Sequence, residues 1–297
     1  MSWDCPHQSG ADARCERLHR ACKPLSPGCV LAGNCELLGP EKKEKPMNTN
    51  TTVDFDPQET VGALVTRLPQ LRQALEQLGL DYCCGGKRSL AEAAAAAGVA
   101  LETALAVLRE AALRPAAEQR DWRSASTTAL ADHIVATHHA FTKSQLARID
   151  RLLGRVQLAH RANHGALLES LRVRFDALRS ELGEHLLKEE EILFPAIREI
   201  DGYLAGRNGR PVVHCGSVAY PIRQMEHEHD GAGEALVSLR QLTDGYRPPA
   251  DACETFRALY DALAALEADL HQHIHLENNV LFPASVRQED QMNASGH

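Results

Sequence analysis

The sequence predicts an all-α protein in which a small helical domain precedes an up-down-up-down bundle of four long helices. Alanine and leucine are abundant, while aromatic residues make up only 4% of the 297 residues, and this composition favours packed helices over β-sandwiches. In residues 122–290, apolar side chains recur three and four residues apart, as on one face of a helix. Short connections between these long helices predict that neighbours run antiparallel.

Residues 1–50 form a cysteine-rich extension that we expect to be poorly ordered. Between five and nine residues separate its consecutive cysteines, unlike the tight Cys-x-x-Cys pairs of zinc sites. Iron binding, zinc binding and a small accessory module all stay open, and Met47 offers a shorter start of translation. The extension holds five of the nine cysteines: Cys5, Cys15, Cys22, Cys29 and Cys35.

Residues 53–115 are predicted to form the small helical domain. Helical sequence over residues 60–78 is followed by a glycine-rich break at residues 83–86, and alanine-rich helical sequence begins at Ser89. Pro115 ends this block because proline cannot continue a helix. In the bundle that follows, we expect the connections near residues 160–164, 202–216 and 244–249.

Two segments of the bundle share the pattern His-x-x-x-Glu with Leu-Phe-Pro at the same offset. The first runs through residues 185–195 and the second through residues 273–283. The helix before each segment also offers a histidine. The bundle therefore consists of two helix pairs that each supply two histidines and one glutamate, namely His138, His185, Glu189, His229, His273 and Glu277.

Helical periodicity predicts that these six side chains point into the bundle. His138 aligns with Ile134 and Ile149, so we expect His138 rather than His139 to face inward, and similar spacing favours His229 over His227. Buried carboxylates are costly unless they are paired or bind a metal, and no lysine or arginine shares these stripes. Mixed imidazole and carboxylate ligands suit iron, and two carboxylates can bridge two metal ions. The alternative, six separately satisfied histidines and glutamates, does not explain the repetition.

Longer motifs add a resemblance to a known family. The segment Asp-Tyr-Cys-Cys-Gly-Gly-Lys at residues 81–87 precedes a bundle with H-x-x-x-E-E-x-I-L-F-P and H-I-x-L-E-N-N-V-L-F-P. Over residues 55–287 the chain resembles the RIC/ScdA family of di-iron proteins that repair iron–sulfur clusters. The resemblance implies a hemerythrin-like bundle with a non-haem centre of two iron ions, preceded by an ScdA-N-like domain. It assigns the iron ligands to the same six residues.

The resemblance also draws attention to two glutamates near the centre. Glu181 and Glu228 match family positions, and Glu181 lies one helical turn before His185. We expect both glutamates to support the ligands from outside, and lining an iron exit path is a further role open to Glu181. A solvated helix glutamate is the alternative. Oxygen-carrying hemerythrins use five histidines, so the set predicted here leaves room for an exchangeable ligand.

Cys83 and Cys84 are adjacent, and a disulfide between neighbouring residues is strained. We interpret them as a thiol pair that binds or passes iron or reacts with nitrosative species. The alternative is a buried apolar pair that closes the small domain. Cys215 and Cys253 are isolated in the sequence, and we expect core or incidental roles for both.

The leading functional hypothesis is repair of iron–sulfur clusters damaged by nitric oxide or reactive oxygen species, with iron donated from the centre and damaged iron–sulfur proteins as partners. Reduction of nitric oxide or dioxygen, or sensing of these gases, is the alternative. A net charge of -8 argues against binding of nucleic acid, and no apolar run approaches the roughly 18 residues of a membrane span. Without a signal peptide at its N-terminus, the chain is expected in the cytoplasm. The sequence leaves open whether the chain forms a homodimer.

Overall fold

The computed structural model describes residues 14–15, 20–21, 54–113, 121–213 and 216–294. The chain divides into two units, Met1–Thr52 and Val53–His297. In the first unit, strands β1 (Arg14–Cys15) and β2 (Arg20–Ala21) pair antiparallel, with Arg14 opposite Ala21. Met47 and the cysteines at positions 5, 22, 29 and 35 lie outside the described residues, as does Cys215.

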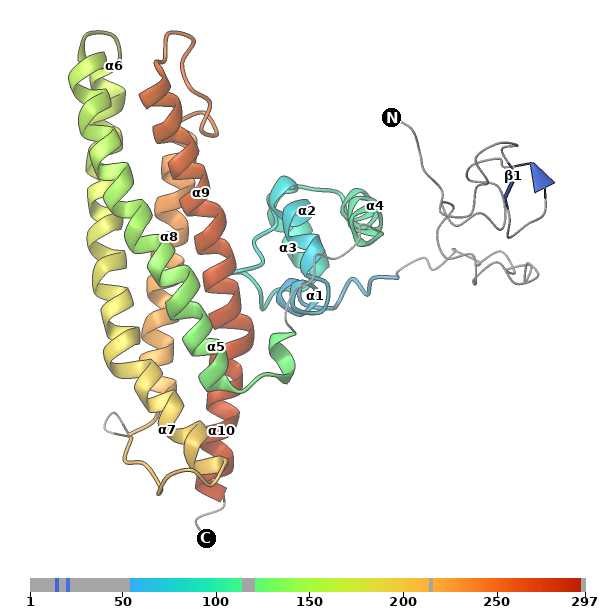
Figure 1. Ribbon diagram of the computed structural model, residues 1–297. Coiled ribbons are helices and arrows are strands. Elements are labelled where there is room, and N and C mark those ends of the chain that lie inside the picture. Colours follow the sequence, from blue (N-terminus) through green and yellow to red (C-terminus); the bar gives the residue numbers. More distant parts are fainter. Residues whose placement is uncertain (1–13, 16–19, 22–53, 114–120, 214–215, 295–297) are drawn as a thin grey trace. The chain divides into compact units, whose positions relative to one another are not determined.

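The second unit begins with the small helical domain (Figure 1). Thr60 and Ser89 cap the first and third helices, and Ser89 forms a capping box with Glu92. Helical sequence over residues 60–78 is interrupted at Pro69, which lacks the N–H that a continuous helix needs. The elements are α1 (Val61–Arg67), the 3₁₀ turn η3 (Pro69–Leu71), α2 (Arg72–Gln77), α3 (Leu90–Ala96) and α4 (Leu101–Ala112).

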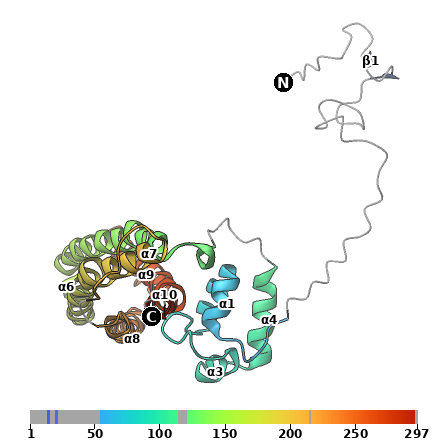
Figure 2. The same ribbon diagram turned by 90° about the horizontal axis from the view of Figure 1, so that it is seen from below.

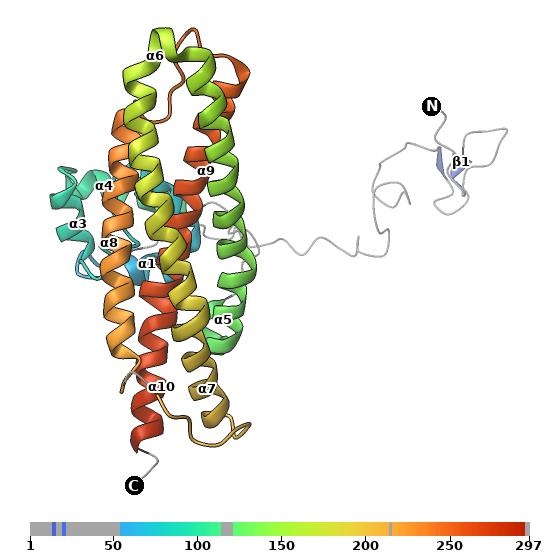
Figure 3. The same ribbon diagram turned by 90° about the vertical axis from the view of Figure 1, so that its left-hand side faces the viewer.

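The described residues from Asp121 onward form the bundle of long helices (Figure 2). The long helix α6 reverses direction at His164, whose φ of -126° and ψ of 18° are not helical, so its two arms are antiparallel helices of the bundle (Figure 3). The elements are η4 (Trp122–Ser124), α5 (Thr127–Ile134), η5 (Val135–His139), α6 (Ala140–Lys188), η6 (Glu189–Leu193), α7 (Phe194–Leu204), α8 (Ala219–Leu242), α9 (Glu254–Leu276), η7 (Glu277–Leu281) and α10 (Phe282–Ala294).

Two apolar clusters fill the bundle core. One contains Phe175 and Leu263 and extends toward the reversal of α6, while the other contains Phe194 and Phe282 near the opposite end. Along each long helix, the buried histidines, together with Glu189 and Glu277, lie between the segments that build these two clusters. The bundle therefore encloses a band of polar groups within an apolar interior.

Within the described residues, no single helix is both long and apolar enough to cross a membrane. One bent pair, α3 with α4, passes the length and composition test when its members are taken together. Several residues of these two helices are buried in the core of the small domain, among them Leu90, Leu105 and Leu108.

Candidate metal centre

In the part of the bundle that the structure describes, three short π-helical segments interrupt the helices at the polar band. They are η5, η6 and η7, and they end at His139 or begin at Glu189 and Glu277. A π-turn inserts one residue into a helix and shifts the face that later residues present. Pro195 and Pro283 favour two of these turns, because each lacks the N–H that would bond to the carbonyl four residues earlier. The repeated Leu-Phe-Pro therefore has a structural role.

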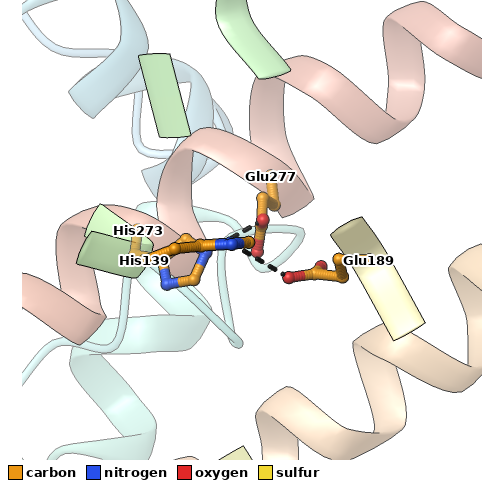
Figure 4. A group of neighbouring side chains, drawn as sticks. All are labelled: His139, Glu189, His273 and Glu277. Carbon is orange, nitrogen blue, oxygen red and sulfur yellow. Dashed lines mark hydrogen bonds and ion pairs between the residues drawn. The ribbon is translucent and has the colours of Figure 1, made fainter. Parts of the chain in front are cut away.

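The first group of candidate ligands is His139, Glu189, His273 and Glu277, all buried (Figure 4). One potential ligand atom from each residue lies within 4.8 Å of the others. His139 Nε2 is 3.3 Å from Glu189 Oε2, and His273 Nε2 is 2.9 Å from Glu277 Oε1. Two imidazoles and two carboxylates, from η5, from η6 and from the continuous helix of α9 and η7, thus converge on a volume suitable for one cation.

The second group contains His185 and His229 with the same two glutamates. His185 Nε2 is 3.4 Å from Glu189 Oε2, and His229 Nε2 is 3.2 Å from Glu277 Oε2. Glu189 and Glu277 therefore belong to both groups, and each group adds its own pair of histidines. Two carboxylates shared between two histidine pairs are the arrangement expected of a dinuclear site with bridging carboxylates.

The structure differs from the sequence prediction at the first histidine. His138 and His139 are both buried, at 2% and 0% exposure, but only His139 joins a candidate ligand group. His138 Nδ1 lies 2.9 Å from Asp269 Oδ1, and His138 belongs to neither candidate ligand group. The π-turn η5 explains the difference, because its additional residue shifts the inward phase from His138 to His139 and then to Thr142, which is completely buried. The same effect in η6 exposes Ile192 and buries Leu193.

Other polar groups orient three of the four ligand histidines through their Nδ1 atoms. The distance is 2.7 Å from His139 to Glu190 Oε1, 2.9 Å from His185 to Glu228 Oε2, and 2.9 Å from His229 to Asn278 Oδ1. Such contacts fix the tautomer in which Nδ1 carries the proton and Nε2 keeps its lone pair for a metal. Glu228 was predicted to lie near the centre, whereas Glu190 and Asn278 directly follow the two glutamates in the sequence and were not predicted.

The protonation states of two candidate ligand histidines suit a metal site. Burial, with a further contribution from neighbouring histidines, lowers the pKa of His139 and of His185 to about 4, so both imidazoles are neutral at pH 7. Neutral imidazole is the form that binds metals. Burial and the charge of Glu277 raise the pKa of Glu189 well above its usual range. For Glu277, burial acts in the same direction, but His273 and His229 together hold its pKa well below its usual value.

Several buried atoms at the centre have no hydrogen-bond partner among the described residues. They include both carboxylate oxygens of Glu189, Oε2 of Glu277 and Nε2 of His139. Unpartnered carboxylate oxygens are costly in an apolar interior, and a cation would satisfy these atoms together. The residues present therefore fit a bound metal pair.

A cavity of about 340 Å³ adjoins the centre. Its lining includes the candidate ligands His185 and His229 together with Glu181, Lys188 and Glu228. Glu181 is exposed, while Glu228 lies 2.6 Å from Lys188 Nζ. Burial opposes ionisation of Glu228, but its bonds from Lys188, Gln224 and His185 lower its pKa to about 2. The same cavity is thus lined by candidate metal ligands and by two further carboxylates.

The loop at residues 81–87 of the small domain, here called the thiol loop because it carries Cys83 and Cys84, contacts this centre. Asp81 Oδ1 accepts hydrogen bonds from the backbone N–H groups of Cys83 and Cys84, and one ligand atom from each of the three residues lies within 4.8 Å of the others. Asn278 Nδ2 donates to the Cys83 carbonyl, 3.2 Å away, while Asn278 Oδ1 contacts His229. One asparagine therefore links the thiol loop to a candidate metal ligand.

The next residue, Asn279, explains one of the two glycines beside the thiols. Asn279 Nδ2 donates to the Tyr82 carbonyl at 3.1 Å. A Cβ atom on Gly86 would lie 2.4 Å from Asn279 Oδ1, so only glycine allows this approach. Cys83 is buried, and Cys84 Sγ lies 3.4 Å from the His229 carbonyl.

Comparisons with known proteins agree with this two-part arrangement. Residues 130–285 match the family model described as the hemerythrin HHE cation binding domain, and residues 57–112 match ScdA_N, described as a domain of unknown function. The chain is 36% identical over 231 residues to the iron-sulfur cluster repair protein YtfE of Pectobacterium atrosepticum, a match that covers 78% of this chain and 98% of that protein. It is 36% identical over 230 residues to the protein of the same name from Escherichia coli O157:H7, covering 77% and 97%. The chain therefore belongs to the RIC/ScdA family, in which an ScdA_N domain precedes a hemerythrin domain.

Proposed function

We propose that this chain binds two iron ions and donates iron to damaged iron–sulfur proteins in the cytoplasm. The sharing of Glu189 and Glu277 by two histidine pairs is the observation that carries the proposal. His139 with His273, and His185 with His229, would each hold one ion between the shared carboxylates. Imidazole and carboxylate ligands suit ferrous iron, and the relatives are named as iron–sulfur cluster repair proteins.

Two features outside the ligand set support release of iron as cargo. Glu181 and Glu228 line the cavity beside the centre, so two carboxylates lie along a path by which a cation can leave. Asp81, Cys83 and Cys84 group potential ligand atoms on the loop that contacts His229 through Asn278. We therefore assign the glutamates to an exit path and the thiols to a role in passing iron.

The experiment is a repair assay with a purified iron–sulfur dehydratase inactivated by nitric oxide. The iron-loaded full-length chain is mixed with it without oxygen, and recovery of dehydratase activity is followed over time. Free ferrous iron at equal concentration is the first control. Glu189→Ala removes a shared ligand, while Glu191→Ala, on an exposed side chain of the same segment, is the matched control.

Recovery by the wild-type chain and by Glu191→Ala should be faster than with free iron, and Glu189→Ala should be no better than free iron. Equal recovery with free iron and with the wild-type chain would contradict iron donation. In that case, nitric oxide consumed over many turnovers would favour a reductase, and reversible binding spectra would favour a sensor. Unchanged iron content in Glu189→Ala would contradict the ligand assignment itself.

A further inference from the structure

A cysteine–histidine pair lies where two connections of the bundle meet. Cys253 stands at the N-cap of α9, and its Sγ is 3.2 Å from Nε2 of His160, near the reversal of α6. Cys253 is exposed, which excludes the first of the two roles expected from its isolation in the sequence, core or incidental. This pair lies far from the metal centre, because the 20 residues from Cys253 to His273 along α9 span about 30 Å.

Neighbouring contacts hold the histidine in place. The His160 ring packs against Phe256, with ring centroids 5.2 Å apart. The nearby carboxylate of Asp251 is engaged elsewhere, by His164 at 2.9 Å and Asn163 at 3.3 Å. In the first turn of α9, the charged side chains of Glu254 and Arg257 lie 3.7 Å from each other. His160 is thus the imidazole that faces the sulfur, while His164 faces a carboxylate.

These surroundings favour the thiolate form of Cys253. The hydrogen bond with His160, followed by the first-turn amides of Phe256 and Thr255, lowers the pKa of Cys253 to about 7. A helix N-terminus stabilises negative charge in the same way. Cys83 lies in the opposite environment, since its contact with Cys84 and its burial raise the pKa of that thiol well above its usual value.

We propose that Cys253, with His160 as its proton acceptor, is a nucleophilic thiol site that hydroperoxides oxidise to the sulfenic acid. The Cys253 thiolate attacks one oxygen of the hydroperoxide, so that an S–O bond forms as the O–O bond breaks. Sulfur loses two electrons and the peroxide gains them. The proton held by the His160 imidazolium passes to the leaving hydroxide or alkoxide, giving water or an alcohol. This chemistry requires no iron, so the site is independent of the proposed repair function.

Alkylation kinetics test the activation of the thiol. The full-length chain is treated with iodoacetamide from pH 5.5 to 9, and modification of each cysteine is followed by peptide mass spectrometry. Wild-type Cys253 should reach half of its maximal rate near pH 7. His160→Gln should react about fivefold more slowly at pH 6.5, since the pKa returns toward about 8.5 while the thiolate becomes intrinsically more nucleophilic. His164→Gln is the matched control and should follow the wild type.

Peroxide oxidation tests the reaction itself. Hydrogen peroxide is added with dimedone, which traps sulfenic acids, to the chain as purified and again after chelation. Adducts should form at Cys253 in both preparations and fall severalfold in His160→Gln. Equal rates at Cys253 in the wild type and His160→Gln would overturn the proposal, and so would adducts that vanish on chelation. If His160→Gln does not fold, a wild-type half-maximal rate near pH 8.5 in the alkylation experiment overturns it as well.

Discussion

At the scale of single residues, His138 and His139 have different surroundings although they are neighbours. His139 Nε2 faces Glu189, whereas His138 Nδ1 contacts Asp269. We predict that His139→Gln lowers bound iron from about two ions to about one per chain, because one histidine pair loses a ligand. His138→Gln should retain about two, because a glutamine side chain still reaches Asp269. Iron analysis of chains loaded without oxygen measures both.

Circular dichroism on both variants checks that neither has lost the bundle. Loss of iron from His138→Gln alone would restore the assignment that simple periodicity predicts. The two variants control for each other, because each replaces a buried histidine by glutamine and the two positions are adjacent in the same π-turn.

His275 leads to a prediction about pH. It is buried beside the thiol loop, and burial, followed by the charge of Arg72, lowers its pKa to about 4. Between about pH 6.5 and pH 4, the unfolded chain binds a proton at this residue that the folded chain does not. The contribution of His275 to stability is therefore complete above pH 6.5 and is lost as the pH falls.

The size of this effect follows from linkage. In that window the free energy of unfolding of the metal-free wild type should fall by about 1.4 kcal/mol per pH unit more than that of His275→Gln. Urea unfolding curves at several pH values measure the difference. A gap between the two proteins that stays constant with pH would show that His275 is not held neutral.

At the scale of elements, the sequence predicted the long helices and the repeated ligand pattern, but not the shift in phase that the π-turns introduce. Five of the six predicted ligands, all but His138, lie in the two candidate groups. Their identification depends on spacing within one helix, as for His185 and Glu189, which periodicity describes well. The position of His139 depends on a π-turn, and its additional residue has no counterpart in a regular 3.6-residue repeat.

The π-turns themselves can be tested through their prolines. Pro283→Ala restores an N–H that can bond to the Asn279 carbonyl and thereby tighten η7 toward an α-helix. We expect the metal-free chain to keep or gain stability, while iron affinity falls severalfold because Glu277 and Asn278 move. Iron titration and thermal unfolding measure the two effects, with Pro249→Ala in the loop before α9 as the control. Unchanged affinity in Pro283→Ala would mean that the proline does not maintain the turn.

At the scale of the whole molecule, the thiols and the ligands belong to different domains that contact each other. We predict that the double variant Cys83→Ser and Cys84→Ser keeps its bundle iron but repairs damaged clusters poorly. The loop should stay in place, because Asn278 bonds to the backbone carbonyl of Cys83 rather than to its sulfur. Two measurements on the same preparation test this. Iron content shows whether the bundle still holds iron, and the dehydratase assay shows whether the iron still reaches damaged clusters. Loss of iron from this variant would contradict the division between the two domains.

The sequence indicated both domains but not the contact between them. The long motifs identified the vicinal cysteines and the bundle, since each is a local pattern. The role of Asn278 depends on residues 195 positions apart in the chain, and the residue type alone does not reveal such a partner. The asparagines directly after Glu277 become informative only once the fold brings the thiol loop to them.

Because Asn278 contacts both His229 and the thiol loop, metal binding at the centre and the position of the loop are thermodynamically coupled. If a filled centre orders His229 and thereby tightens the loop, then by thermodynamic reciprocity the loop tightens the hold on iron by the same factor. A partner that draws the loop toward its own damaged cluster would then loosen the iron at the moment of docking. The free protein would retain its iron and would release it when it binds the damaged partner protein, with no separate signal for release.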